Sequence, residues 1–301
     1  MKYASVIVTF NREALLGDAI ESVLSQTVKP EYVIVLDNHS TDNTPTMMKK
    51  YANNKTVIYL RTKENVGGSM GFYLGLTKAY ELGADWICLS DDDAIFEKHY
   101  FERIDKKIQS NSKVQCFTGT VRSPDNSIQL VHRRKLINTA TVKEVPIASE
   151  AYKHDFNIDG FTFVGVLFSR KLIASAGLPE KDYFIWNDDA EYALRVRKLT
   201  KILNVSEATV YHYNNVTVQQ KFKPSWKEYY GIRNRIQMEH KHSTNRMMLI
   251  PSNLLFIARR LVGMTVKADH RPYFGYLLKQ LKDGYLDGIK GISGKNMNYL
   301  P

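Results

Sequence analysis

Cysteine and long apolar runs are both scarce in this 301-residue sequence. Only Cys88 and Cys116 occur, and Cys88 lies inside an apolar run, so neither a disulfide framework nor a cysteine metal site is expected. The longest apolar stretch, Leu249 to Val262, is interrupted by polar residues, a proline and two arginines. It is also shorter than the roughly 20 residues that cross a bilayer, so we expect no transmembrane helix.

Low-complexity segments and internal repeats are lacking as well, and we expect no signal peptide. The strand-like run Tyr3 to Thr9 begins at once, without a charged leader, a spacer or a small-residue cleavage site. We therefore expect a cytoplasmic protein, with the inner face of the membrane as an additional place of action. Hydrophobic residues make up 44% and charged residues 24%, which is typical of a globular chain. Its length suits one α/β domain and a smaller appendage.

Negative charge is scarce toward the end of the chain. The net charge is +11, and from Lys221 onward 15 Lys and Arg stand against 5 Asp and Glu. Such an excess fits nucleic acid, an anionic membrane surface or a polyanionic substrate, and composition alone does not choose among them. A helical appendage that packs on the α/β domain or forms a homo-oligomer is a further alternative. The asymmetry favours a surface-binding tail.

The first hundred residues alternate between short apolar runs and amphipathic helical patterns. This alternation predicts βαβ units and a mostly parallel sheet flanked by helices. The predicted strands are Tyr3 to Thr9, Tyr32 to Asp37, Val57 to Arg61, Trp86 to Leu89 and, later, Phe161 to Phe168. Further helices are expected near Asp188 and beyond Asn214, where the composition changes. We therefore predict two regions, an α/β domain over residues 1–214 and a basic, mainly helical region over residues 215–301.

Polar side chains follow each of the first four predicted strands. They are Asn11 and Arg12, Asp37, Asn65, and the run Asp91-Asp92-Asp93. In open parallel sheets, ligands bind outside the carboxyl ends of the strands, so these side chains are expected to share one site. Three adjacent carboxylates repel one another unless a cation compensates, and oxygen ligands suit Mg²⁺ or Mn²⁺. The alternative is a solvated turn that caps a helix starting at Ala94.

The glycine pair Gly67-Gly68 follows Asn65 and precedes a helical pattern. Glycine has no Cβ, so its backbone amides can approach a ligand, and the N-terminus of the following helix favours an anion. The segment is neither a Walker loop nor a dinucleotide fingerprint, and a simple tight turn is the alternative.

A second acidic segment, Trp186-Asn187-Asp188-Asp189-Ala190-Glu191, begins a predicted helix. Asp188 and Glu191 have the spacing of a capping box. Asp189 would then lie in the first helical turn, where the helix dipole keeps a carboxylate ionised for use as a general base. The alternative is that both aspartates only cap the helix. Trp186 could pack against an acceptor sugar or belong to the core.

His212 ends a strand-like run that starts at Ala208. Its imidazole could bind the same metal as the aspartates, although a lone histidine is more often structural.

Together these motifs resemble the family-two inverting glycosyltransferases of the GT-A fold, over roughly Tyr3 to His212. The motifs that carry the resemblance are Val8-Thr-Phe-Asn-Arg12, Asp37-Asn-His-Ser-Thr-Asp42, Asn65-Val-Gly-Gly-Ser69, Asp91-Asp-Asp93, Trp186-Asn-Asp-Asp-Ala-Glu191 and His212. Within the family, the chain looks most like bacterial galactofuranosyltransferases, with rhamnosyltransferases as close relatives. Met70 and Asn187 depart from the galactofuranosyltransferase pattern.

The resemblance implies a role for each candidate residue. The residues expected to bind the nucleotide-sugar are Thr9, Asn11, Arg12, Asp37, Asn65, Gly67, Gly68 and Asp92. The expected metal ligands are Asp91, Asp93 and His212, the expected base is Asp189, and the expected acceptor contacts are Trp186 and Asp188. The implied donor is UDP-galactofuranose, with dTDP-rhamnose as the alternative, and the implied acceptor is a glycan or a lipid-linked sugar of a bacterial cell-surface polysaccharide.

Other function classes fit the residues less well. A nucleotidyltransferase would need a Gly-rich, basic loop after the first strand, and Phe10-Asn11-Arg12 has no glycine. An aspartate phosphohydrolase would carry its nucleophile where Thr9 stands. A nucleic-acid-binding protein is suggested by the basic and aromatic tail, but the carboxylates at the sheet end would repel phosphates without a metal. We therefore expect no nucleic-acid partner and a tail that docks the enzyme near membrane-bound acceptors.

Overall fold

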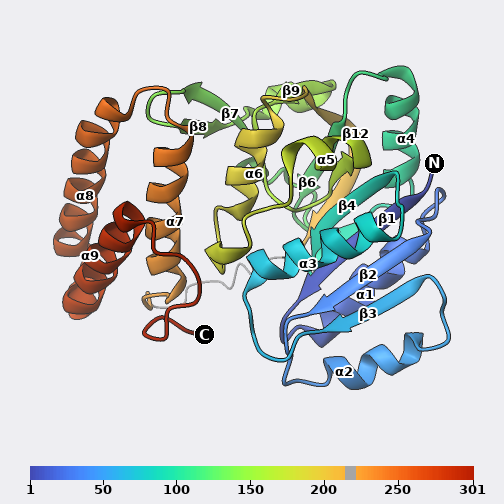
Figure 1. Cartoon of the computed structure of the whole chain (residues 1–301), viewed down its shortest axis with the longest axis horizontal. Coiled ribbons are helices and arrows are strands. Elements are labelled where there is room, and N and C mark those ends of the chain that lie inside the picture. The colour runs from blue at the N-terminus through green and yellow to red at the C-terminus, as the bar shows by residue number, and fades with distance from the viewer. Residues whose placement is uncertain (214–221) are drawn as a thin grey trace.

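The computed structural model describes residues 1–213 and 222–301, and it combines a mixed β-sheet flanked by helices with three long helices beside it (Figure 1). The main sheet has the strand order β3-β2-β1-β4-β11-β6-β12-β5, and β9 also pairs with β12. The strands are β1 (Tyr3–Thr9), β2 (Tyr32–Asp37), β3 (Val57–Arg61), β4 (Trp86–Asp91), β5 (Ala94–Phe96), β6 (Cys116–Arg122), β9 (Phe156–Ile158), β11 (Val166–Ser169) and β12 (Ile202–His212). The four strands from β3 to β4 are parallel, and β11 runs antiparallel to both of its neighbours.

A small second sheet has the order β10-β7-β8. Its strands are β7 (Arg133–Asn138), β8 (Lys143–Pro146) and β10 (Gly160–Phe161). The α-helices are α1 (Glu13–Leu24), α2 (Thr44–Met47), α3 (Gly68–Glu81), α4 (Tyr100–Ser110), α5 (Arg170–Ala176), α6 (Asp188–Val196), α7 (Lys227–His242), α8 (Leu249–Val266) and α9 (Phe274–Lys290). Short 3₁₀ turns lie between them, of which η5 (Arg246–Met248) leads directly into α8.

Successive residues of β1 pack in two separate apolar clusters, one on each face of the sheet. Ile7 packs in the cluster that contains α1 and α4, whereas Val6 and Val8 pack in the cluster that contains α3. Such two-sided burial is typical of parallel strands covered by helices on both faces. A Cβ on Gly71 or Gly75 of α3 would meet the Val8 or Val6 side chain at 2.7 or 2.3 Å, so only glycine lets α3 lie this close to β1. The start of α3 is thereby held beside the end of β1.

The predicted α/β fold is confirmed, and the first three predicted strands have the bounds expected from the sequence. The fourth strand extends two residues further, to Asp91, because Ser90 and Asp91 continue the pairing with β1. The strand predicted over Phe161 to Phe168 was wrong as one element. The chain turns at Gly165, whose φ is +66°, so β10 pairs with β7 and β11 pairs with β4 and β6.

The region after residue 222 is helical, as expected. The predicted boundary between residues 214 and 215 lies outside the described residues. Within this region α7 packs on α9, and α7 lies nearest to the sheet and its flanking helices (Figure 1).

The length argument against a membrane-spanning helix was wrong. With η5, the helix containing α8 runs over 21 residues from Arg246 to Val266, and an 18-residue window of it has a mean hydropathy of 1.3. It is therefore long and apolar enough to cross a membrane, by length and composition only. Pro251 was counted as an interruption, but proline is tolerated in the first helical turn, where its missing N–H has no partner to lose.

Candidate active site

A cavity of about 390 Å³ lies where the carboxyl ends of β1 and β4 meet the N-termini of α3 and α6. Every predicted site residue except Asn11 and Asp37 lines it. The predicted residues in its wall are Thr9, Arg12, Asn65, Gly67, Gly68, Asp91, Asp92, Asp93, Trp186, Asp188, Asp189 and His212. Residues nearly 200 positions apart in the sequence therefore share one pocket, as the strand-end argument predicts.

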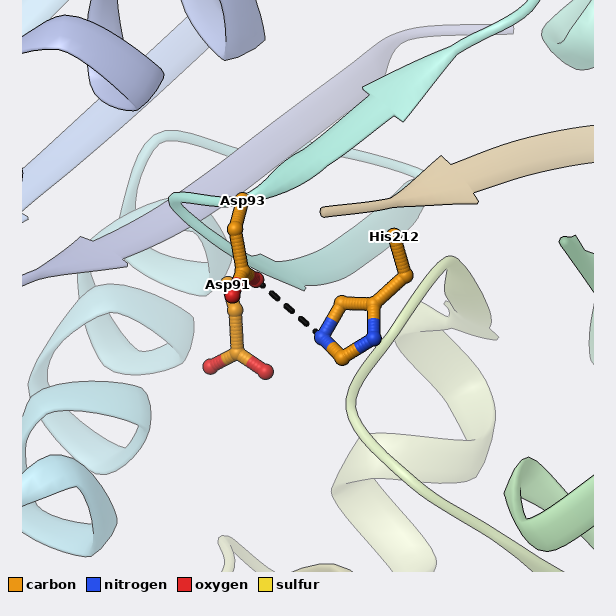
Figure 2. Close-up of side chains that lie close together, drawn as sticks. All are labelled: Asp91, Asp93 and His212. Atoms are coloured by element: carbon orange, nitrogen blue, oxygen red, sulfur yellow. Dashed lines mark ion pairs between the residues drawn. The ribbon is translucent and has the colours of Figure 1, made fainter. Parts of the chain in front are cut away.

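Asp91, Asp93 and His212 form one cluster in this cavity. One potential ligand atom from each lies within 4.8 Å of the others, and His212 Nε2 is 3.1 Å from Asp93 Oδ1. Figure 2 shows the His212 ring directed at Asp93, with the Asp91 carboxylate beside them. Strand pairing creates this proximity, because β5 follows the aspartates and pairs with the end of β12, Ala94 opposite His212. The alternative of a helix starting at Ala94 is thereby excluded.

Gln129 orients the His212 ring. His212 Nδ1 lies 3.0 Å from Gln129 Oε1, and the Gln129 amide nitrogen donates to the His212 carbonyl and to Ser123. Because the amide oxygen can only accept, His212 must donate its Nδ1–H to it. Nε2 is then the nitrogen that faces the carboxylates and can offer a lone pair. Such a hydrogen bond behind the ring is typical of histidines that bind metals.

Arg12 supplies positive charge to the aspartate run. Its Nη1 pairs with Asp93 and lies 3.3 Å from Asp92 Oδ1. Asp92 also accepts hydrogen bonds from Thr9 Oγ1 at 2.7 Å and from the Phe10 backbone at 3.4 Å. Asp92 thus connects the end of β1 to the end of β4. Its predicted contact with the nucleotide-sugar stays a prediction.

The electrostatics of the cluster follow from its burial. Burial raises the pKa of Asp91 well above its ordinary value, and the neighbouring charge of Asp93 raises it further. Burial alone would lower the pKa of His212, but the hydrogen bond and charge of Asp93 outweigh it and raise that pKa. The arrangement therefore concentrates negative charge that one imidazole and one guanidinium only partly compensate.

The cluster fits a divalent cation. Two carboxylates and one imidazole nitrogen form a donor set suited to Mn²⁺ and Mg²⁺ among other metals, and the three side chains converge from two separate strands. Asp93 is 3% exposed, and a buried carboxylate of this kind is stabilised when a cation replaces its lost hydration.

The Asn65 segment has the geometry of an anion site. Asn65 Oδ1 accepts from Asn38 and from the Gly67 backbone, which fixes the loop before α3. Gly67 has a φ of +86°, and a Cβ there would meet the Phe184 carbonyl oxygen at 2.1 Å. Glycine is therefore required at this position. This requirement fits both a simple tight turn and a loop whose backbone amides approach a ligand. Gly68 begins α3, whose N-terminus faces the cavity.

Asp37 and Asn11 do not line the cavity. Asp37 is fully buried, and it accepts from the Ser40 backbone at 2.7 Å and from the Tyr59 hydroxyl at 2.5 Å. Asn11 has a φ of 56° and accepts from the Thr41 backbone at 2.7 Å. Both side chains organise the loops next to the cavity, and their predicted contacts with a nucleotide stay predictions.

Asp189 lies in the first turn of α6, as predicted, but the capping box was wrong. Asp188 is the first helical residue, and the N-cap is Asn187, which makes no side-chain cap. The Glu191 carboxylate does not reach back to the helix start, because it pairs with Arg195, Lys241 and His242. Glu191 therefore joins α6 to the C-terminal helix α7.

Asp188 and Asp189 form a coupled acidic pair. Burial, and next the charge of Asp189, raise the pKa of Asp188 to about 8, and burial raises that of Asp189 to about 6. The Asp189 carboxylate accepts from the Ala190 backbone at 2.7 Å, which favours its ionised form. At neutral pH the Asp189 carboxylate is therefore the one of the pair that can accept a proton.

The loop before α6 has an unusual backbone that a distant residue stabilises. Phe184, Trp186 and Asn187 all have φ values between 65° and 67°, which residues other than glycine seldom adopt. Asn234 of α7 is fully buried, and its amide donates to the carbonyls of residues 183, 185 and 186, each at 2.9 Å. Sequence reasoning missed Asn234, because nothing near residue 234 indicates a partner about 50 positions earlier. Trp186 is 42% exposed, so the core alternative for its ring does not hold.

The C-terminal helices also contribute to the cavity wall directly. Trp226, Lys227 and Pro301 line it, and none was predicted as a site residue. Burial, and next the positive charge of Arg12, lower the pKa of Lys227. The clustering of Lys and aromatic residues after Lys221 was the available signal, but it was interpreted as a surface tail.

Comparisons with known proteins agree with this geometry. The galactofuranosyltransferase GlfT1 of Mycolicibacterium smegmatis is 31% identical over 205 residues, which cover 64% of each chain. The protein of the same name from Mycobacterium tuberculosis is 27% identical over 64% of this chain and 63% of its own. The match thus spans less than two thirds of these relatives' length.

Solved structures share the fold at low sequence identity. S. aureus TarS residues 1–349 in complex with UDP has a TM-score of 0.58 and 14% identity, over 97% of this chain and 92% of that one. GalNAc-T7 with UDP, GalNAc and Mn²⁺ has a TM-score of 0.60 and 13% identity, over 79% of this chain and 47% of that one. The fold is therefore the GT-A fold. Because the model of glycosyl transferase family 2 matches residues 5–175, more than half of the sequence, the chain belongs to that family.

Proposed function

We propose that the protein is an inverting, metal-dependent glycosyltransferase that transfers galactofuranose from UDP-galactofuranose to a glycan or lipid-linked acceptor. The observation that carries the proposal is one cavity in which the Asp91, Asp93 and His212 cluster faces the acidic pair at the start of α6. The name of the mycobacterial relatives supports the choice of sugar.

The donor half of the reaction needs groups that hold a diphosphate. A divalent cation bound by Asp91, Asp93 and His212 would neutralise charge on the departing diphosphate. Arg12 and Lys227 add positive charge in the same wall. The start of α3 also lines the cavity, and the partial positive charge of a helix N-terminus suits a phosphate oxygen.

The acceptor half needs a base that is ionised at neutral pH. Asp189 meets this requirement, because its pKa of about 6 leaves it mostly deprotonated, whereas the pKa of about 8 keeps Asp188 mostly protonated. Asp189 would take the proton of the acceptor hydroxyl while that oxygen attacks the anomeric carbon from the face opposite the diphosphate. The single displacement inverts the anomeric configuration. Protonated Asp188 and the exposed ring of Trp186 are suited to hold the acceptor sugar.

The test is a panel of nucleotide-sugars that includes UDP-galactofuranose and dTDP-rhamnose, assayed with Mn²⁺ or Mg²⁺ and with a chelator. We expect release of UDP from UDP-galactofuranose, stimulated by a glycan acceptor and abolished by chelation. Faster turnover of dTDP-rhamnose would overturn the donor, and undiminished turnover in the chelator would overturn the metal ligands. Turnover of none of the sugars, with tight nucleic-acid binding instead, would overturn the function.

A further inference from the structure

One face of α8 is apolar and exposed along its whole length. The outer stripe of this helix consists of Met247, Ile250, Leu254, Leu255, Val262 and Val266, which are between 51% and 78% exposed. Apart from the adjacent pair Leu254 and Leu255, successive members lie three, four or seven residues apart, which places them on one side of the helix. The helix lies at the end of the molecule away from the sheet, with α7 and α9 on its inner side (Figure 1). Only 17% of its apolar window is buried, so the stripe does not form part of the core.

The opposite face of α8 is already occupied. Leu249, Asn253 and Met264 are buried there, and Met264 packs with Leu277 and Leu281 of α9. The inner face of α8 therefore packs on the fold without any contribution from the outer stripe. Contiguous apolar patches of this kind are rare on soluble monomers and mark interaction surfaces.

The charge around the stripe is mostly positive. No Asp or Glu occurs from residue 246 to residue 266, whereas three arginines do. A cavity of about 430 Å³ between α7, α8 and α9 is lined by Arg259, Arg260 and Lys267 together with Lys223 and His270. Arg260 donates to Glu228 at 2.8 Å, while Arg259 has no ion pair with any residue of the described ranges. Positive charge therefore borders an apolar surface, which is the pattern of an interfacial helix.

We propose that the outer stripe of α8 docks on an anionic lipid membrane, with the helix lying along the surface and Arg259, Lys267 and Lys223 facing the lipid phosphates. The apolar side chains enter the boundary between headgroups and acyl chains, and the basic groups meet the opposite charge of the leaflet. Docking in this orientation keeps the fold intact, because the inner face of α8 stays on α9.

Two other occupants of the stripe fit less well. A spanning helix would carry Arg259 and Arg260 into the hydrocarbon, where each charged residue is strongly disfavoured, and would pull Asn253 and Met264 away from α9. A second copy of the chain across a twofold axis would bring equivalent arginines toward one another without any acidic residue on α8 to pair them. The charge of the surface favours a negatively charged partner.

The experiment is flotation of the full chain with vesicles of phosphatidylcholine alone or of equimolar phosphatidylcholine and phosphatidylglycerol. We expect binding to the anionic vesicles, with weaker binding at high salt and to neutral vesicles. Leu255→Glu should weaken binding at least tenfold, and Arg259→Gln by about fivefold, which is the contribution of one basic residue near an anionic surface. The matched controls are Leu199→Glu, because Leu199 is 49% exposed against 51% for Leu255, and Lys171→Gln; both should bind as the parent does.

Four outcomes would overturn the proposal. Absence of binding to anionic vesicles would exclude membrane docking. Binding that Leu255→Glu leaves unchanged would exclude the outer stripe of α8 as the docking surface. A chain that is dimeric by light scattering and becomes monomeric only in Leu255→Glu identifies a second copy as the occupant. Protein that resists both high salt and alkaline washing of the vesicles identifies a spanning helix. Because flotation requires no turnover, its failure would leave the proposed glycosyl transfer untouched.

Discussion

The two halves of the candidate active site are held in different ways. Asp91 and His212 lie at the ends of β4 and β12, whose neighbouring strands hold them in a hydrogen-bonded register. The loop that carries Trp186 toward α6 has no such ladder, and it keeps its left-handed residues through Asn234 of the C-terminal helix α7. The half that would bind the metal is therefore built into the sheet, and the half that would bind the acceptor depends on the helical region.

This difference explains why the C-terminal helices are more than an appendage. Besides Asn234, the Arg233 side chain donates to the carbonyl of Tyr183, and Lys241 and His242 pair with the buried Glu191 of α6. These contacts cross the boundary between the catalytic fold and the helices. We infer that changes at Asn234 of α7 alter proton transfer and leave donor binding nearly unchanged, whereas changes at the strand ends alter donor binding first.

The largest effect is expected at the base. Asp189→Asn should lower the transfer rate by about 10³-fold, within the range for a positioned general base, while UDP affinity changes less than twofold. Turnover and UDP binding by calorimetry measure the two quantities. Asp125→Asn is the control, since Asp125 is exposed and away from the cavity. Retained turnover in Asp189→Asn would remove Asp189 from the role of base.

Loss of the loop support should come next. Asn234→Ala leaves the carbonyls of the strained loop without their donor, so we expect kcat to fall about 10- to 100-fold from misplacement of the acceptor side. The KM for the donor should stay within twofold, and a donor KM that rises in step with the fall in kcat would contradict the division into two halves. Asn253→Ala is the matched control, because Asn253 is also a buried asparagine of the C-terminal helices, and it should leave kcat unchanged.

The metal half is tested by the residue behind its histidine. Gln129→Ala removes the acceptor for His212 Nδ1–H, and loss of such a partner typically weakens metal binding about 10- to 100-fold. Mn²⁺ titration by electron paramagnetic resonance measures this directly. Gln115→Ala, which removes a contact to Ser169 outside the cavity, should bind Mn²⁺ as the parent does. Equal affinities in the two variants would exclude the proposed orientation of His212.

The smallest effect is expected from pH. The raised pKa of Asp189, about 6, means that kcat falls as the pH drops from 7 through 6. The sign follows because the base works only when it is deprotonated. Because Asp188 and Asp189 interact, the pH dependence of kcat reports on the pair and not on one carboxylate alone. A kcat that rises on acidification would contradict the assignment of either carboxylate as the base.

Much of the sheet half could be predicted from the sequence. Apolar runs bounded by polar residues gave the bounds of β1, β2 and β3. The rule that ligands collect at the carboxyl ends of strands brought Arg12, Asn65 and Asp91 into one site. His212 does lie beside Asp93, because β5 pairs with β12, a pairing that the sequence does not show. Its predicted role as a metal ligand stays a prediction.

The helical half could not be predicted in the same way. The backbone of Phe184, Trp186 and Asn187 is set by hydrogen bonds from about 50 residues away, and local propensity opposes it. The outer stripe of α8 did have a signal, the spacing of its apolar residues. It was overlooked because Pro251 was counted as an interruption rather than as a residue of the first turn.

The most direct measurement is calorimetric titration of UDP into the parent protein with Mn²⁺, with a chelator, and into Asp93→Asn with Mn²⁺. The account expects tight binding in the first case and a loss of affinity of about tenfold or more in the other two, since the cation would bridge the protein to the diphosphate. Equal UDP affinity in all three would contradict the assignment of Asp91, Asp93 and His212 as the metal site that grips the donor.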